Sequence, residues 1–184
     1  MQLGRVVLDG ESTPQRVVID KKDWYAWDGD DWLQPQKGAP IAGNGRLVAP
    51  LAPGKIVCVG LNDLDHVTER DPNRKIPDEP VLFMKPTSSI IGPGDTIQIA
   101  NPDNQTDYEA ELAVVIGRPA KDVDVADALS FVAGAMPFND VSARDLQLQN
   151  PLWTSGKAID TFAPCGPALV TLDEAGDLGA LTLR

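Results

Sequence analysis

The 184-residue chain is long enough for one domain with a real core, and its hydrophobic content of 42% is that of an ordinary globular protein. It carries 27 acidic and 16 basic residues, a net charge of −11, which argues against nucleic acid or an anionic membrane as a partner. No stretch approaches the roughly 20 apolar residues that cross a bilayer, and the N-terminus opens no apolar signal-peptide core. We therefore expect a soluble, cytoplasmic protein.

Residues 1–50 are predicted to form a small N-terminal β unit. Short strand candidates at 6–8, 16–19 and 24–27 are separated by Asp-Gly and other turn formers. Three of the four tryptophans, Trp24, Trp27 and Trp32, fall here, which suggests a local aromatic core. Prolines and glycines between residues 35 and 53 then predict a loop or linker.

Residues 51–184 are predicted to form a second unit of mixed α/β, mainly β, structure. Apolar runs at 56–60 and 81–85 predict strands, and residues 70–80, rich in proline and charge, predict a loop that could act as a lid. The clearest helix signal runs from Val125 to Ala133, with Asp124 as a cap and an apolar stripe at Ala128, Leu129 and Val132. Cys58 and Cys165 are too few and too far apart for a zinc motif or a disulfide framework.

Glu109 and Glu111 are the most informative residues of the chain. They precede the apolar run 112–116, and residues two apart on a strand point to the same face, so two carboxylates lie side by side on a mostly buried strand. Such like charges repel unless a proton or a cation relieves them. Asp140 is a third acid in an apolar stretch, and three carboxylates without a nearby histidine suit Mg²⁺ or Mn²⁺. The alternative is that one or both glutamates face water on an edge strand.

His66, the only histidine, precedes Glu69 by three residues, a spacing that brings the two side chains together on a helical turn. A carboxylate fixes the tautomer of an imidazole and raises its basicity, so the pair could form a general base. Surface helices also carry such pairs without function, and this alternative stays open.

Seven blocks in the chain, taken in order, resemble the fumarylacetoacetate hydrolase family. The resemblance covers roughly residues 55–172 and is closest to the shorter members, of the 2-hydroxyhepta-2,4-diene-1,7-dioate isomerase and acylpyruvate hydrolase type. The blocks are 55–62, His66-x-x-Glu69, Phe83-Met84-Lys85-Pro86, 89–95, 107–112, 139–145 and 157–164.

The resemblance implies mixed β-sheets rolled around an active site, usually in a homodimer. It also implies Mg²⁺ or Mn²⁺ bound by the two glutamates and Asp140, with His66 and Glu69 as the catalytic pair. Further implied roles are catalysis or support of the metal site for Lys157 and substrate binding for three residues. Those three are Lys85, Arg144 and Gln147.

The activity implied by the resemblance is metal-dependent chemistry on 2-oxo acids or 1,3-dicarbonyl compounds through a metal-stabilised enolate. Hydrolysis of a C–C bond in an acylpyruvate-type substrate is expected slightly ahead of isomerisation or decarboxylation of aromatic-degradation intermediates, or decarboxylation of oxaloacetate. For hydrolysis, His66 oriented by Glu69 would deprotonate the attacking water.

Two departures from the family pattern bear on this expectation. Asp63 stands where the family usually has tyrosine, and the chain reaches Arg184 without the Gly-Asp…Thr-Gly-Thr-Pro type segment that closes the sheet in family members. A second expectation is therefore a truncated, non-catalytic domain that pairs with a chain carrying those strands. A third is a binding module that kept the metal site and lost turnover.

Overall fold

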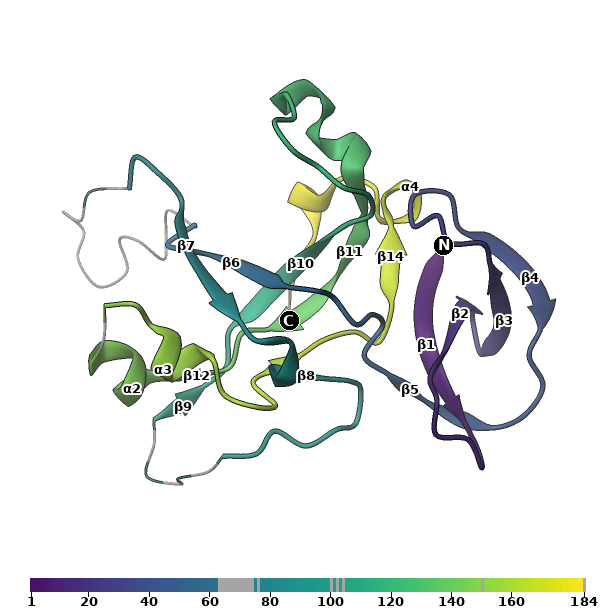
Figure 1. The fold of residues 1–184 in the computed structure, drawn as a ribbon, viewed down its shortest axis with the longest axis horizontal. Coiled ribbons are helices and arrows are strands. Elements are labelled where there is room, and N and C mark those ends of the chain that lie inside the picture. Colours follow the sequence, from purple (N-terminus) through teal and green to yellow (C-terminus); the bar gives the residue numbers. More distant parts are fainter. Residues whose placement is uncertain are drawn as a thin grey trace.

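A twisted, eight-stranded sheet organises the computed structural model, which describes residues 1–62, 75, 77–99, 101, 103, 105–149 and 151–183 (Figure 1). Its strand order is β10-β11-β14-β1-β2-β3-β4, and β5 also pairs with β1. The strands are β1 (Gln2–Leu8), β2 (Gln15–Asp20), β3 (Asp23–Asp28), β4 (Gln36–Pro40), β5 (Gly45–Val48), β10 (Ala110–Ile116), β11 (Val132–Asn139) and β14 (Leu169–Thr171).

The N-terminal strands form an antiparallel meander from β1 to β4, as the turn signals predict. Strands β4 and β5, however, lie in the segment where proline and glycine predicted a loop. Pro40 is tolerated because it ends β4, the last strand of the sheet path, where a missing N–H costs no ladder bond in the described residues. The N-terminal unit is therefore richer in strands than its sequence indicates.

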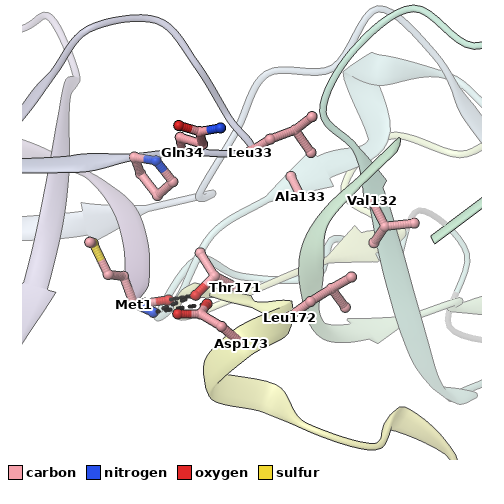
Figure 2. Close-up of a pocket in the computed structure, with 9 residues that line it drawn as sticks. Met1, Leu33, Gln34, Val132, Ala133, Thr171, Leu172 and Asp173 are labelled. Carbon is pink, nitrogen blue, oxygen red and sulfur yellow. Dashed lines mark hydrogen bonds and ion pairs between the residues drawn. The ribbon is translucent and has the colours of Figure 1, made fainter. Parts of the chain in front are cut away.

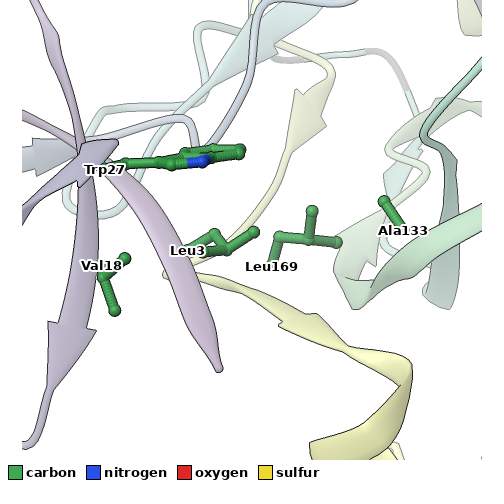
Figure 3. Packing of buried hydrophobic residues seen from close by; sticks show 5 residues of the cluster. All are labelled: Leu3, Val18, Trp27, Ala133 and Leu169. Atoms are coloured by element: carbon green, nitrogen blue, oxygen red, sulfur yellow. The ribbon is translucent and has the colours of Figure 1, made fainter. Parts of the chain in front are cut away.

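The aromatic core predicted for the N-terminal unit extends into the second half of the chain. Trp27 meets Trp32 edge to face, with ring centroids 4.6 Å apart. Trp27 is buried in one cluster with Leu3 and Val18 and with two residues of the later strands, Ala133 and Leu169 (Figure 3); the remaining predicted core residue, Trp24, is partly buried on β3. Buried side chains from both halves thus share this cluster.

The sheet itself is continuous across the predicted boundary at residue 50. Strand β1 pairs on one side with β2 and on the other with β14, where Gln2 lies opposite Val170. The division into residues 1–50 and 51–184 stays a prediction, and the antiparallel ladder of β1 with β14 shows that any such units share their sheet.

The helix predicted from Val125 to Ala133 is wrong in type and extent. Residues 125–131 form a 3-10 helix, η2 (Val125–Phe131), without a side-chain hydrogen bond from Asp124, and β11 begins at Val132. Of the predicted apolar stripe, Ala128 and Leu129 are exposed, Leu129 at 69%, and Val132 is only partly buried. From Val132 onward the chain is a strand, because β11 pairs with β10 on one side and β14 on the other, and these ladders provide hydrogen-bond partners for its backbone.

Strand β10 forms as predicted, but only part of it is buried. It is the terminal strand of the described sheet, and Val114 and Ile116 are exposed at 48% and 58%. Both residues point to the same face of the sheet, and that face of β10 is poorly covered in the described structure. The position of β10 bears directly on Glu109, which precedes the strand, and on Glu111 within it.

The remaining elements are short, and several of them, including β6, β7, α2 and α3, lie on the side of β10 that faces away from β1 (Figure 1). Among the described residues they include the two-stranded ladders β6–β7, β8–β13 and β9–β12 and two small helices that matter for the site, α2 (Arg144–Gln149) and α3 (Thr154–Lys157). The strands are β6 (Ile56–Gly60), β7 (Val81–Lys85), β8 (Ile90–Ile91), β9 (Thr106–Asp107), β12 (Ser142–Ala143) and β13 (Ala163–Pro164); the other helices are η1 (Thr87–Ser89), α4 (Leu172–Ala175) and η3 (Leu178–Ala180). In the described ranges, no helix has the length and apolarity needed to span a membrane.

Candidate active site

Asp140 stands at the centre of the candidate site, immediately after β11 ends at Asn139. The main chains of β10 and β11 hold it there, because the N–H of Asp140 donates to the carbonyl of Glu109 over 3.0 Å. In return, the N–H of Glu109 donates to the side-chain oxygen of Asn139 over 3.1 Å. The main chain therefore places Glu109 and Asp140 near each other, as the sequence predicts. Asp140 is only 3% exposed, and a charged group is rarely buried without a partner.

Lys157 joins the two carboxylates. Its ammonium donates to Oε2 of Glu109 over 2.7 Å and to Oδ2 of Asp140 over 2.6 Å, and its side chain is 2% exposed. The lysine lies at the end of α3, 17 residues after Asp140. A cation placed between two acids removes the repulsion that would otherwise make their burial costly.

Lys85, at the end of β7, supports Asp140 from the opposite side. Its side chain is 0% exposed, and its ammonium donates to Oδ1 of Asp140 over 2.6 Å and to the carbonyl of Val141 over 3.0 Å. Burial lowers the pKa of Lys85, and the charge of Asp140 offsets only part of that shift. The predicted substrate contact of Lys85 stays a prediction; its geometry is that of a residue that fixes the aspartate.

Arg144, the first residue of α2, extends the chain of charges outward. Its guanidinium donates to Oε1 of Glu109 over 2.5 Å, to the side-chain oxygen of Gln147 over 3.0 Å, and through two N–H groups to Oδ2 of Asp107 at 3.1 and 2.8 Å. Arg144 and Gln147, both predicted to lie near the substrate or its supporting shell, thus contact each other, and Arg144 also contacts Glu109.

Six charged side chains therefore alternate in sign along one line. Lys85, Asp140 and Lys157 are sealed at its inner end, whereas Glu109 and Arg144 keep 21% and 20% of their side-chain surface exposed. Formal charge balances along this line, with three cations and three anions. Asp107, at the outer end, is 47% exposed, so a ligand from solvent would approach from the end formed by Asp107, Arg144 and Glu109. In order, the six are Lys85, Asp140, Lys157, Glu109, Arg144 and Asp107.

The ion pairs set the protonation of Glu109. Burial alone would raise the pKa of its carboxyl, but the hydrogen bond and charge of Lys157, together with Arg144, hold that pKa below its ordinary value of 4.5. Glu109 thus stays ionised at neutral pH.

A pH dependence of stability follows from this lowered pKa. A carboxyl whose pKa is lower in the folded state contributes stability above its unfolded pKa and loses it as the pH falls through the folded value. In chelator, we expect the free energy of unfolding to decline as the pH drops below 4.5, with a shallower decline in Glu109→Gln. Urea titrations at a series of pH values measure both slopes, and identical slopes would contradict the coupling.

Glu111 lies two residues beyond Glu109 and is exposed on the terminal strand of the described sheet. This position matches the alternative in which one glutamate faces water on an edge strand. Its charge nevertheless reaches the site. Burial first, then the charge of Asp140, raises the pKa of Cys58 to about 11, and Glu111 adds to that rise.

The donor chemistry of these acids fits a hard divalent cation. Carboxylate oxygens are the ligands that Mg²⁺ and Mn²⁺ prefer, and Glu109 and Asp140 already converge on one cationic group. Within the described residues, however, no three acid, histidine or cysteine side chains gather closely enough to hold an ion. Glu109, Glu111 and Asp140 remain the predicted ligands, with Lys157 between two of them.

The predicted catalytic pair, His66 and Glu69, lies outside the described residues, as do Asp63 and most of the predicted lid. Sequence reasoning also missed one member of the charged line. Asp107 holds Arg144 through two hydrogen bonds, and the available signal was its place in the same acidic run, two residues before Glu109.

A hollow of about 360 Å³ lies elsewhere, between the N-terminus and α4 (Figure 2). The N-terminal ammonium bonds Thr171 there and lies 3.8 Å from Asp173. None of the predicted site residues that the structure describes lines this hollow. The alternating line of buried charges is therefore the better candidate for a catalytic centre.

The chain belongs to the fumarylacetoacetate hydrolase family: residues 55–184 match the family described as Fumarylacetoacetate (FAA) hydrolase C-terminal. The resemblance and the mainly β fold inferred from the sequence are thereby confirmed.

Named relatives are enzymes. The mitochondrial oxaloacetate tautomerase of Xenopus laevis is 45% identical over 144 residues, which are 77% of this chain and 44% of that protein. The solved 5-carboxymethyl-2-hydroxymuconate delta-isomerase of Mycobacterium smegmatis is 37% identical, with a TM-score of 0.78 over 93% of this chain and 67% of its own. The fumarylacetoacetate hydrolase of Exiguobacterium antarcticum is 34% identical, with a TM-score of 0.76 over 94% and 67%. This chain spans about half the length of the curated relatives it matches.

Proposed function

We propose that this chain carries the site of a divalent-cation-dependent enzyme that moves a proton between carbon and oxygen in a 2-oxo acid such as oxaloacetate. The observation that carries the proposal is the buried Lys157 ammonium between the carboxylates of Glu109 and Asp140. A fixed cation at this position is preorganised to stabilise an oxyanion, because it need not reorient as the charge develops.

The reaction converts an enol into its keto form without loss or gain of atoms. The enol oxygen gives up its proton, the electron pair returns to form the carbonyl, and the adjacent carbon takes up a proton. A bound dication would supply charge stabilisation at the oxygen atoms of the 2-oxo acid. Glu109, Glu111 and Asp140 would hold that ion.

Lys157 would stabilise the enolate oxygen directly. An ammonium has three N–H donors, and Glu109 and Asp140 accept from two of them in the described structure. Within the described residues no other acceptor takes the third, which would bond an incoming oxyanion. Arg144 would keep Glu109 in place, since its guanidinium is already bonded to that carboxylate and to Asp107.

Relatives named for tautomerisation and isomerisation favour proton transfer over hydrolysis, although the sequence alone ranked hydrolysis slightly higher. A test offers oxaloacetate, acetylpyruvate and fumarylpyruvate with Mn²⁺, Mg²⁺ or chelator, and follows enol absorbance and products. We expect metal-dependent loss of enol with the carbon skeleton intact. Cleavage to two acids would favour hydrolysis, release of CO₂ would favour decarboxylation, and a wild-type chain inert to all three would contradict the proposal.

C–C bond hydrolysis is the second candidate, favoured by the spacing of His66 and Glu69. In that reaction the hydroxyl of water adds to the distal carbonyl carbon. The electron pair of the broken C–C bond moves into the enolate of the departing 2-oxo acid, which a proton then quenches. His66 would take the proton from the attacking water.

His66→Ala separates the two candidates. If the enzyme is a hydrolase, we expect cleavage to fall by roughly 10²- to 10⁴-fold, since a positioned base contributes about that much. Mn²⁺ affinity should stay unchanged, because imidazole is not among the proposed ligands. If the variant cleaves the substrate at the wild-type rate, His66 has no role in the mechanism.

Glu111→Gln tests the third proposed ligand. We expect Mn²⁺ affinity, measured by isothermal titration calorimetry, to fall by roughly 10- to 100-fold when a carboxylate that serves the ion becomes a neutral amide. The matched control is Glu11→Gln, which neutralises an exposed glutamate in the turn between β1 and β2. Equal affinities in the two variants would exclude Glu111 as a ligand.

A further inference from the structure

Trp153 makes an unusual entry into α3, the helix that carries Lys157. It is the residue before the helix and has left-handed backbone dihedrals, φ 57° and ψ −10°. A large side chain at positive φ is unfavourable, and such a residue persists only where its surroundings hold it in place. Its carbonyl accepts the N–H groups of Gly156 and Lys157 over 3.0 and 3.1 Å. The backbone of Trp153 thus sets where the helix begins.

The indole ring of Trp153 is held by the hairpin of β6 and β7. It meets Phe83 edge to face, with ring centroids 5.6 Å apart. A Cβ at position 60 would come within 2.4 Å of Cζ3 of Trp153, so only glycine leaves room for the ring. Phe83 in turn lies 5.1 Å from the Lys157 ammonium, within cation–π range.

The opposite side of α3 is pinned against α2. A Cβ at position 156 would lie 2.7 Å from the carbonyl oxygen of Ala143 and 2.6 Å from the backbone nitrogen of Gln147. The Ser155 hydroxyl donates to the Leu146 carbonyl over 3.1 Å. A four-residue helix has little stability of its own, so these outside contacts determine its position.

We propose that Trp153 is a positioning residue. Its ring, seated on Gly60 and Phe83, fixes α3 so that the Lys157 ammonium stays between Glu109 and Asp140. The relevance of this role to turnover rests on the proposed function, whereas the positioning itself is a property of the folded chain.

Reductive methylation of lysines, read by mass spectrometry, tests the positioning without any turnover. In the wild-type chain, exposed Lys121 should react fast while buried Lys157 and Lys85 stay protected. In Trp153→Ala, we expect labelling of Lys157 to rise by about tenfold or more through local opening, with Lys85 unchanged. Trp153→Phe should restore protection.

Lys85 is the internal control, because it belongs to the same charged line but is carried by β7. Equal rises at Lys85 and Lys157 would show general loosening and overturn the proposal, as would continued protection of Lys157 in Trp153→Ala. Gly60→Ala gives a second route, since its methyl group displaces the indole and should expose Lys157 in the same selective way; unchanged protection there would also overturn it.

A double-mutant cycle then connects the positioning to catalysis. If Trp153 acts through Lys157, Trp153→Ala lowers kcat in the wild-type background and has no further effect in Lys157→Met. Independent losses that multiply in the double variant would contradict that route. A wild-type chain that turns over no 2-oxo acid contradicts the proposed function, and the methylation pattern still decides whether Trp153 positions Lys157.

Discussion

Asp140→Asn is expected to have the largest effect of any single substitution. The aspartate accepts hydrogen bonds from two buried lysines, and the amide would leave Lys85 without its anion and Lys157 with the carboxylate of Glu109 alone. Removing one partner of a buried pair costs about 3–5 kcal/mol, so we expect the free energy of unfolding in urea to fall by about that amount.

The same substitution should also remove function. Mn²⁺ affinity and turnover are expected to fall together, by roughly 10²-fold or more, because a proposed ligand is lost and the lysine that faces it is displaced. Asp127→Asn is the matched control, since it neutralises an exposed aspartate in η2, remote from the charged line. Wild-type stability and affinity in Asp140→Asn would contradict the structural role assigned to the carboxylate.

Lys157→Met is expected to be the second most damaging substitution, and its effect should depend on metal. The methionine leaves the carboxylates of Glu109 and Asp140 facing each other without the cation that both contact. In chelator, we expect a loss of about 3–5 kcal/mol in unfolding free energy. Turnover should fall by roughly 10²–10³-fold, the size of effect seen when an oxyanion-stabilising donor is removed.

Mn²⁺ should restore part of the stability of Lys157→Met, because a dication bound by the same carboxylates relieves their repulsion and favours the folded state. Urea unfolding with and without Mn²⁺ measures this difference. Lys121→Met, which removes an exposed lysine, is the control. The same deficit in Mn²⁺ as in chelator would show that these carboxylates do not serve the ion.

Much of the site could be anticipated from local pattern. Two acids at a spacing of two and a third in an apolar stretch pointed to Glu109, Glu111 and Asp140, and the ladder of β10 with β11 brings the first and the last of these together. The location of Lys157 came only from the resemblance, since nothing in its own surroundings indicates that a four-residue helix delivers it to two acids far earlier in the chain. The contact of Lys85 with Asp140 could not be predicted from local pattern either. Strand alternation puts the Lys85 side chain on one face of the strand but does not identify the residue that it meets there.

The helix predicted at 125–133 failed for a physical reason. The apolar spacing of Ala128, Leu129 and Val132 suits a helix, but periodicity does not register the ladders that β11 forms with β10 and β14. Prolines and glycines misled in the opposite direction at β4 and β5, where the sheet accepts Gly38 and Pro40 at its edge. Strands β11 and β5 pair with segments distant in the sequence, which no local window contains, whereas β4 pairs with the neighbouring β3.

Direct titration of Mn²⁺, followed by electron paramagnetic resonance, tests the central claim most directly. The wild-type chain and Asp140→Asn would be titrated with and without oxalate, a dianion that presents the paired oxygens of a 2-oxo acid. We predict a single Mn²⁺ site in the wild type whose spectrum changes with oxalate, and loss of that site in Asp140→Asn. A wild-type chain that leaves Mn²⁺ free in solution, or an Asp140→Asn variant that binds Mn²⁺ and oxalate like the wild type, would contradict the account.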